Sequence, residues 1–119
     1  MDPLFTIAQK KSFTVVTLTA ESLMSAAILK ELGPQLYRLI DEENHTKLIL
    51  DLGRVRDVSS QFIGIIIAMH TKASKRRGRL VLVGLHDKLS ELMQLTRLDR
   101  VITIVPTVQD ALERDWVLG

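Results

Sequence analysis

The chain has 119 residues, with 16 Lys and Arg against 14 Asp and Glu, so its formal net charge is +2. With 46% hydrophobic and 25% charged residues, the composition excludes a disordered or fibrous protein, and the absence of cysteine excludes disulfides and thiolate metal sites. This length is typical of one domain, and we expect residues 1–119 to form a single one.

Two strands and a helix are expected at the N-terminal end. Leu4–Ala8 and Phe13–Thr19 are rich in Thr, Val, Ile and Phe, and the polar residues 9–12 between them predict a four-residue hairpin connection. Apolar residues then recur at helical spacing from residue 28 to residue 40. Ser25 is the expected N-cap of that helix, and Pro34 is expected to kink it because proline cannot donate to the carbonyl four residues back.

The rest of the chain alternates between short apolar runs and amphipathic segments. The apolar runs predict buried strands at Lys47–Leu52, Arg79–Val83 and Val101–Val105. The amphipathic segments predict helices over Gln61–Arg76, Lys88–Leu95 and Val108–Arg114, with Thr107 as the last N-cap and Trp116 packed on the last helix. The element order β-β-α-β-α-β-α-β-α predicts an α/β fold, with about four helices on a mainly parallel sheet opened by a hairpin.

Signatures of catalysis and of cofactor binding are missing from the chain. Its six glycines form neither a phosphate-binding loop nor a dinucleotide fingerprint, and no G-x-S-x-G motif precedes a helix. His45, His70 and His86 stand far apart, without the spacing of metal ligands, so each is interpreted as a surface or packing residue. We therefore expect no catalytic residue, no cofactor and no metal.

A basic cluster lies at the end of the second predicted helix and contains Lys72, Lys75, Arg76, Arg77 and Arg79. Cations at this position offset the negative end of the helix dipole, so the cluster is interpreted as a solvated helix end. A docking surface for an acidic protein and a nucleic-acid site are the alternatives. Because aromatic residues make up only 4% of the chain, direct binding of nucleic acid is not expected.

The ends and apolar runs of the sequence bear on its location. The N-terminus lacks the basic-then-apolar pattern of a signal peptide. The longest apolar run, Phe62–Met69, is too short to cross a bilayer. We expect a cytoplasmic protein without membrane insertion.

One serine-bearing segment leads from a buried strand into an apolar helix, and it reads Asp57-Val58-Ser59-Ser60-Gln61. An N-cap role would account for either serine, because a hydroxyl at a helix start accepts a hydrogen bond from a free backbone N–H. The functional alternative is phosphorylation, since the positive end of the helix dipole accommodates the added charge. This segment is nearly devoid of cations, and composition and spacing leave both alternatives open.

The stretch from residue 47 to residue 112 resembles the STAS domain, which bacterial anti-sigma-factor antagonists share with the tails of sulfate transporters. The similar segments are the strand KLILDLGRV, the turn and helix VSSQFIGIII, the strand RRGRLVLVGL, the segment ELMQLTRLDRVITIV and the helix start VQDAL. Residues 15–41 match more loosely. A chain without membrane spans resembles the antagonist branch rather than a transporter tail.

The family motif of that branch reads roughly I-D-S-S-G-L-G, and a kinase that doubles as the anti-sigma factor phosphorylates its first serine. With Gly64 on the last glycine of the motif, Ser60 falls on the phosphorylated serine and Ser59 on the aspartate. Gln61 then stands for the second serine and Phe62 for the first glycine.

The resemblance implies a regulatory protein without enzymatic activity, which binds an anti-sigma factor or switch serine kinase. Phosphorylation is expected at Ser60, with Ser59 as the second candidate, and it would weaken binding. The expected partner surface is the exposed face of the second helix together with Asp57, Ser59, Ser60, Gln61, Phe62 and Ile63.

Two other functions remain open at this point. The first is a constitutive STAS interaction subunit of a larger signalling or transport assembly, which uses the same surface without being phosphorylated. The second is a small hydrolase that pairs Ser60 with His70 or His86, although His70 lies ten residues further on, about 15 Å along one helix axis. The partner's identity is open, and so is the formation of a homodimer.

Overall fold

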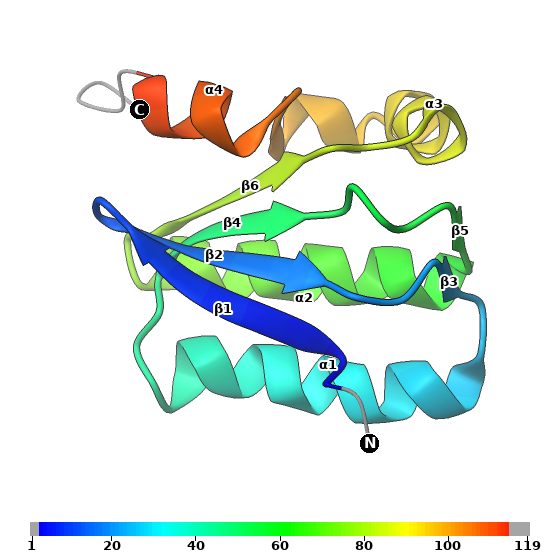
Figure 1. Cartoon of the computed structure of the whole chain (residues 1–119), viewed down its shortest axis with the longest axis horizontal. Helices are drawn as coiled ribbons and strands as arrows, with labels where there is room; N and C mark the ends of the chain where they lie inside the picture. The colour runs from blue at the N-terminus through cyan, green and yellow to red at the C-terminus, as the bar shows by residue number, and fades with distance from the viewer. Residues whose placement is uncertain (1–2, 115–119) are drawn as a thin grey trace.

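The computed structural model describes residues 3–114, which form a mixed sheet of five strands with helices on both faces (Figure 1). The strands stand in the order β1-β2-β4-β6-β7. β1 and β2 are antiparallel, and every later pair is parallel. Their bounds are β1 Phe5–Lys10, β2 Phe13–Leu18, β4 Lys47–Asp51, β6 Arg79–Val83 and β7 Thr103–Val105. The predicted α/β fold, with a mainly parallel sheet opened by a hairpin, is confirmed.

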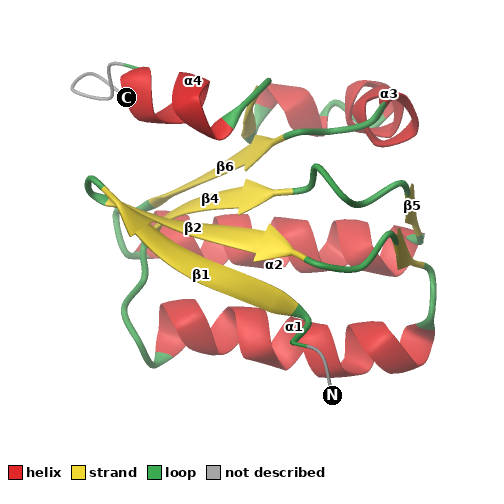
Figure 2. Cartoon of the chain, viewed as in Figure 1, coloured by secondary structure: helices red, strands yellow, loops and turns green. Residues whose placement is uncertain are grey.

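Four α-helices pack around this sheet, and Figure 2 shows α1 and α2 together on one side of it, with α4 on the other. The helices are α1 Ala26–Asp41, α2 Ser60–Lys75, α3 Asp87–Leu95 and α4 Val108–Glu113. α1 is one helix through Pro34, and its expected N-cap is confirmed because the Ser25 hydroxyl accepts the Ile28 N–H at 3.4 Å. Thr107 likewise caps α4 by accepting the Asp110 N–H at 3.1 Å. Trp116 lies outside the described residues.

The alternation of side chains along each strand divides the core into two parts. Val16, Leu18, Leu48 and Leu50 face α1 and α2 and belong to the larger hydrophobic cluster. The intervening residues form a smaller cluster on the other face, where they meet Ala111 of α4. Strands buried on both faces explain why β4 and β6 are continuous apolar runs in the sequence.

The hairpin is tighter than the sequence predicted. Lys10 pairs directly with Phe13, which leaves a two-residue connection instead of the expected four. Lys11 adopts a φ of 57°, in the left-handed region that such short turns require. Gln9 belongs to β1, and its side-chain amide donates to the Thr14 hydroxyl at 2.9 Å across the hairpin.

A second, two-stranded sheet was missed by the sequence analysis. β3 (Ser22–Leu23) runs parallel to β5 (Asp57–Val58). The Arg56 N–H donates to the carbonyl of Glu21 at 2.7 Å, which fastens the segment before α1 to the segment before α2. Two residues are too few to show an alternating pattern, so this pairing left no signal in the sequence.

The last predicted strand is shorter than expected. Val101 and Ile102 do not belong to it. They connect a short 3₁₀ helix, η1 (Leu98–Arg100), to β7. Ile102 is nevertheless buried, whereas Val101 is 59% exposed. The apolar run therefore combines a strand with a connection that anchors one side chain in the core.

The basic cluster at the end of α2 forms contacts with the end of α1. Lys72 Nζ lies 2.6 Å from Asp41 Oδ2, and Arg76 donates to Asn44 Oδ1 at 2.7 Å and to the Asp41 carbonyl at 3.0 Å. These contacts join the C-terminal ends of α1 and α2. They support the interpretation of the cluster as structural for Lys72 and Arg76.

Tyr37 of α1 lies beside this contact, with Lys72 Nζ 5.2 Å from its ring centroid. Burial raises the pKa of the Tyr37 hydroxyl above its ordinary 10.0, and the positive charge of Lys72 lowers it in part. The pKa of Tyr37 is thus higher in the folded protein than in the unfolded one. The contribution of Tyr37 to the free energy of unfolding is therefore complete below the unfolded pKa and is lost as pH rises through the folded pKa.

We expect Lys72→Met to raise the pKa of Tyr37 further, because the substitution removes the charge that favours the phenolate. The chain has one tyrosine, so the ultraviolet absorbance of phenolate follows this group alone. Lys75→Met is the control, because it removes a charge from an exposed position of the same helix. It should leave the pKa of Tyr37 unchanged. An unchanged midpoint in Lys72→Met would contradict the contact.

Candidate functional site

The serine-bearing segment forms a sharp turn between β5 and α2. β5 ends at Val58, and Ser60 is the first residue of α2. A backbone hydrogen bond ties the turn to β3, because the Ser59 N–H donates to the carbonyl of Leu23 at 3.1 Å. The predicted arrangement of strand, serine turn and apolar helix is therefore present, with an additional strand supporting it.

Ser59 is the N-cap residue of α2 but does not form the cap bond, which was one of the two alternatives left open for the serines of this segment. Its φ of −90° and ψ of 165° are extended, as N-cap residues require, yet its side chain accepts no backbone N–H of the helix. The Ser59 hydroxyl is buried and has no hydrogen-bond partner among the described residues. As a candidate for phosphorylation Ser59 is therefore disfavoured, because a kinase cannot reach a buried hydroxyl without moving the turn.

Ser60, the other candidate, is exposed at the first position of α2. No acidic residue lies in the first turn of this 16-residue helix. The free N–H groups and the positive dipole end at this position favour an added negative charge. Ser60 is thus the accessible hydroxyl of the turn.

Two of the six residues expected on the partner surface point into the core instead. Phe62 is 0% exposed and belongs to the larger hydrophobic cluster, and Ile63 is 9% exposed. The expectation that these side chains contact a partner is wrong for the structure as it stands, because their side chains fill the space under the sheet. The large side chain of Phe62 adds no bulk to the surface at Ser60.

The exposed face of α2 beyond Ser60 is shallow and partly apolar. Gln61 and Gly64 are exposed, and a Cβ added to Gly64 would meet nothing within 4 Å. Ile67, one turn further, is 41% exposed. This face therefore offers a partner an accessible surface that begins at Ser60.

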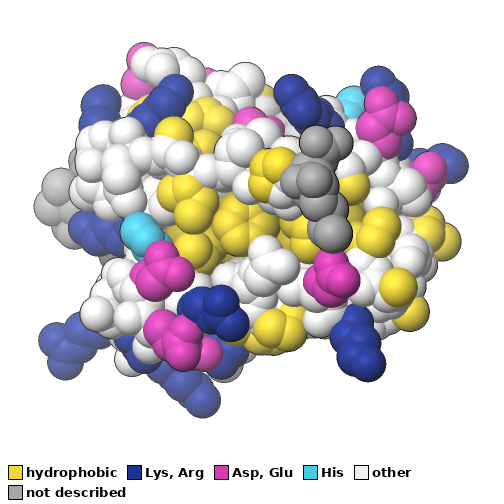
Figure 3. Space-filling model, turned by 60° about the horizontal axis from the view of Figure 1, so that its bottom comes forward, with side chains coloured by type: hydrophobic (Ala, Val, Ile, Leu, Met, Phe, Trp, Pro, Cys, Tyr) yellow, Lys and Arg dark blue, Asp and Glu magenta, His cyan; other side chains and the backbone are white. Residues whose placement is uncertain are grey.

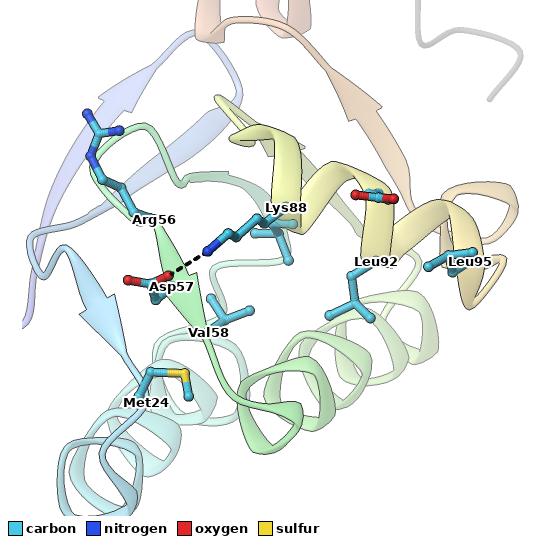
Figure 4. Close-up of a pocket in the computed structure, with 9 residues that line it drawn as sticks. Met24, Arg56, Asp57, Val58, Lys88, Leu92 and Leu95 are labelled. Atoms are coloured by element: carbon cyan, nitrogen blue, oxygen red, sulfur yellow. Dashed lines mark ion pairs between the residues drawn. The ribbon is translucent and has the colours of Figure 1, made fainter.

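The sequence suggested that the turn has almost no cations near it, but α3 places one beside it. Lys88 Nζ of α3 lies 3.7 Å from the Asp57 carboxylate of β5 (Figure 4). Both side chains are largely exposed, so this ion pair contributes little to stability. Its effect is to place one positive and one negative charge beside the turn.

A groove that the sequence analysis did not anticipate lies next to this ion pair. Its volume is ≈ 380 Å³, and Figure 4 shows Met24 and Val58 on one side of it, with Leu92 and Leu95 of α3 on the other. Met24 is 56% and Leu95 76% exposed, so two large apolar side chains are accessible at this groove. The groove combines three segments distant in the sequence, so only the unexplained exposed apolar residues of α3 could have indicated it.

The hydrolase alternative finds no support in this geometry. α2 is one helix from Ser60 to Lys75, which keeps His70 about 15 Å along the axis from Ser60. The His86 ring is engaged elsewhere, since its Nε2 lies 2.8 Å from the carbonyl oxygen of Gly53. His45 contacts the Thr14 hydroxyl at 2.8 Å and is likewise part of a packing contact. Over residues 3–114, no group of three or more His, Asp or Glu is placed to hold a metal ion.

Two observations now identify the family. The order of strands and helices, with a serine turn entering α2, is the arrangement expected from the resemblance, and the sequence model of the STAS domain matches residues 5–111. The chain belongs to the STAS domain family. Among residues 3–114, no helix of this STAS domain is long and apolar enough to cross a membrane.

Relatives of this STAS domain are named for one regulatory role. A candidate anti-sigma factor antagonist of Thermotoga maritima is 30% identical over 71 residues, which are 60% of this chain and 63% of the relative. Its homologue from Thermotoga neapolitana is 28% identical over the same shares. The matched region thus spans less than two thirds of these relatives.

Solved structures show the same fold over nearly the whole chain. A STAS domain protein from Planctomyces limnophilus matches with a TM-score of 0.79 and 19% identity, covering 91% of this chain and 93% of that one. The phosphorylated form of SpoIIAA, a cell-fate determinant of Bacillus, matches with a TM-score of 0.71 and 16% identity, covering 92% and 97%. At these identities the likeness concerns the fold.

Proposed function

We propose that this STAS domain is an anti-sigma-factor antagonist without enzymatic activity, which binds a serine kinase or anti-sigma factor until Ser60 is phosphorylated. The observation that carries the proposal is the contrast within the turn: Ser60 is exposed at the start of α2, whereas the neighbouring Ser59 hydroxyl is buried. A single accessible hydroxyl beside an accessible helix face suits a site that is both modified and bound. The names of the Thermotoga relatives support this assignment.

The proposed partner surface consists of Ser60, Gln61, Gly64 and Ile67 on α2, continued by the groove beside Asp57. The apolar groove supplies area for burial on binding, and the Asp57–Lys88 pair supplies charges at its rim. Phe62 and Ile63 support this surface from beneath without contacting the partner.

Phosphorylation of Ser60 would act at this surface through its charge. A phosphate adds about −1.5 to −2 charge. At the helix start that charge is favourable within the free protein, so the domain stays folded. Within a contact that excludes water, repulsion by acidic groups and the cost of dehydrating the phosphate weaken binding. A loss of about 1.4 kcal/mol is already a tenfold change in affinity.

The test uses affinity purification of the tagged domain from cells of its source organism in the presence of phosphatase inhibitors. Mass spectrometry is expected to place phosphate on Ser60 and not on Ser59, and Ser60→Ala to abolish it. Wild type and Ser60→Ala should recover a protein with a serine-kinase fold. Ser60→Asp should recover at least tenfold less of it.

Ser74→Asp is the matched control, because it adds the same charge to an exposed serine near the other end of α2. It should recover as much partner as wild type. Phosphate on neither serine of the turn, together with equal recovery by Ser60→Asp, would overturn the switch. Stable recovery of one partner by every variant would instead identify a constitutive interaction subunit.

A further inference from the structure

The outer edge of β1 is open along the whole strand. β1 stands at the end of the five-stranded sheet, and among residues 3–114 it pairs only with β2. The opposite edge of the sheet is β7, which has only three residues. β1 has six, and it carries neither charge nor proline from Phe5 to Gln9. Charges and prolines in an edge strand are the usual protection against pairing with another chain.

The backbone groups that face this open edge belong to Phe5, Ile7 and Gln9. The Thr19 N–H donates to the Leu4 carbonyl at 3.1 Å, one step beyond the pair that joins Phe5 to Leu18. In an antiparallel ladder, residues alternate between bonding their partner strand and facing away from it. Residues 4, 6 and 8 therefore bond to β2, and the three odd-numbered residues present free N–H and C=O groups to the outside.

The side chains of the same three residues lie on the face of the sheet that α1 and α2 cover. Ile7 pairs with Val16 and Phe5 with Leu18, and both β2 residues face the core beneath α1 and α2. Ile7 is nevertheless 44% exposed. Figure 3 shows hydrophobic side chains gathered across the middle of the face that includes α1, with charged side chains around them.

We propose that two copies of this chain pair antiparallel through the outer edges of their β1 strands, with a two-fold axis at Ile7. In this register Ile7 exchanges N–H and C=O bonds with Ile7 of the second copy, and Phe5 does so with Gln9 of the second copy. Any other register leaves at least one of these three residues without a partner within β1. The pairing joins the two sheets into one and covers both Ile7 side chains.

The one charge on β1 does not oppose a second copy in this register. Lys10 is the one charged residue of the strand, and it stands three residues from the axis. Its counterpart stands three residues away on the other side, so the two are about 20 Å apart at 3.4 Å per residue. That separation exceeds the Debye length at physiological salt, so their repulsion is screened.

Cysteine cross-linking tests the register directly, because the chain has no cysteine of its own. Opposed residues that exchange hydrogen bonds have Cα atoms about 5.5 Å apart, which a disulfide can bridge. Oxidised Ile7→Cys should therefore migrate mainly as a covalent dimer without reductant. Ile67→Cys is the matched control, since Ile67 is 41% exposed and lies on α2, and it should remain largely monomeric.

Sedimentation of the unmodified protein gives an independent measurement. Wild type should dimerise with rising concentration, and Ile7→Lys should weaken the dimer at least tenfold, whereas Ile67→Lys should not. Circular dichroism checks that each variant is folded. If Ile7→Lys does not fold, the cross-linking of Ile7→Cys compared with Ile67→Cys still decides the proposal. A wild-type protein that stays monomeric at every concentration, or Ile7→Cys that cross-links no better than Ile67→Cys, would overturn the proposal.

Discussion

Replacing Phe62 with alanine is expected to lower the free energy of unfolding by about 3–5 kcal/mol. Phe62 is 0% exposed and is among the largest fully buried side chains of the described protein. Its truncation removes apolar contacts in the cluster beneath the sheet and leaves a cavity that the surrounding helices and strands fill only in part. Chemical denaturation of wild type and variant measures the difference.

Gln61→Ala is the control, since the neighbouring side chain is exposed and its loss should change stability by less than about 0.5 kcal/mol. The pair also tests the proposed site. If Phe62 only supports the turn from beneath, any loss of partner binding in Phe62→Ala should follow the fraction of unfolded protein. A stable Phe62→Ala protein that no longer binds would instead place this side chain in the interface.

Gly78→Ala is expected to destabilise the protein by about 3 kcal/mol. A Cβ at this position would overlap the carbonyl oxygen of Thr46 and lie 2.6 Å from its carbonyl carbon. The same carbonyl accepts the Arg79 N–H at 2.7 Å, next to the first pair of the β4–β6 ladder. Relief of the overlap must therefore separate two central strands where their pairing begins.

Gly64→Ala is the opposite case in the same protein. Gly64 lies inside α2, and a Cβ there meets no atom within 4 Å. Alanine should raise the free energy of unfolding by about 0.5–1 kcal/mol, because it restricts the unfolded chain and favours the helix. Thermal denaturation of the two variants beside wild type should move their midpoints in opposite directions. A Gly78→Ala protein as stable as wild type would contradict the close approach to Thr46.

The strands and helices of this fold were predictable where a single segment determines its own burial. β4 and β6 are buried on both faces, so their apolar runs were visible without any knowledge of their neighbours. The N-caps Ser25 and Thr107 were predictable for the same reason, since each bonds within its own helix. The family resemblance then placed the serine turn at the start of α2.

What the sequence did not reveal depends on contacts between distant segments. The burial of the Ser59 hydroxyl follows from packing around the turn, which a motif does not encode. The groove is formed by the segment just before α1, by β5 and by α3, which are distant from one another in the sequence. The tight turn at Lys11 is a local feature, and it was not predicted because lysine seldom adopts a positive φ.

The short pairing of β3 with β5 has a mechanical consequence for the proposed switch. It fastens the segment leading into α1 to the turn leading into α2, while Lys72 and Arg76 fasten the far ends of the same two helices. The two helices are thus connected to each other at both ends. We expect a phosphate on Ser60 to leave these contacts in place, so the modified and unmodified domains should have nearly the same shape and differ in the charge they present.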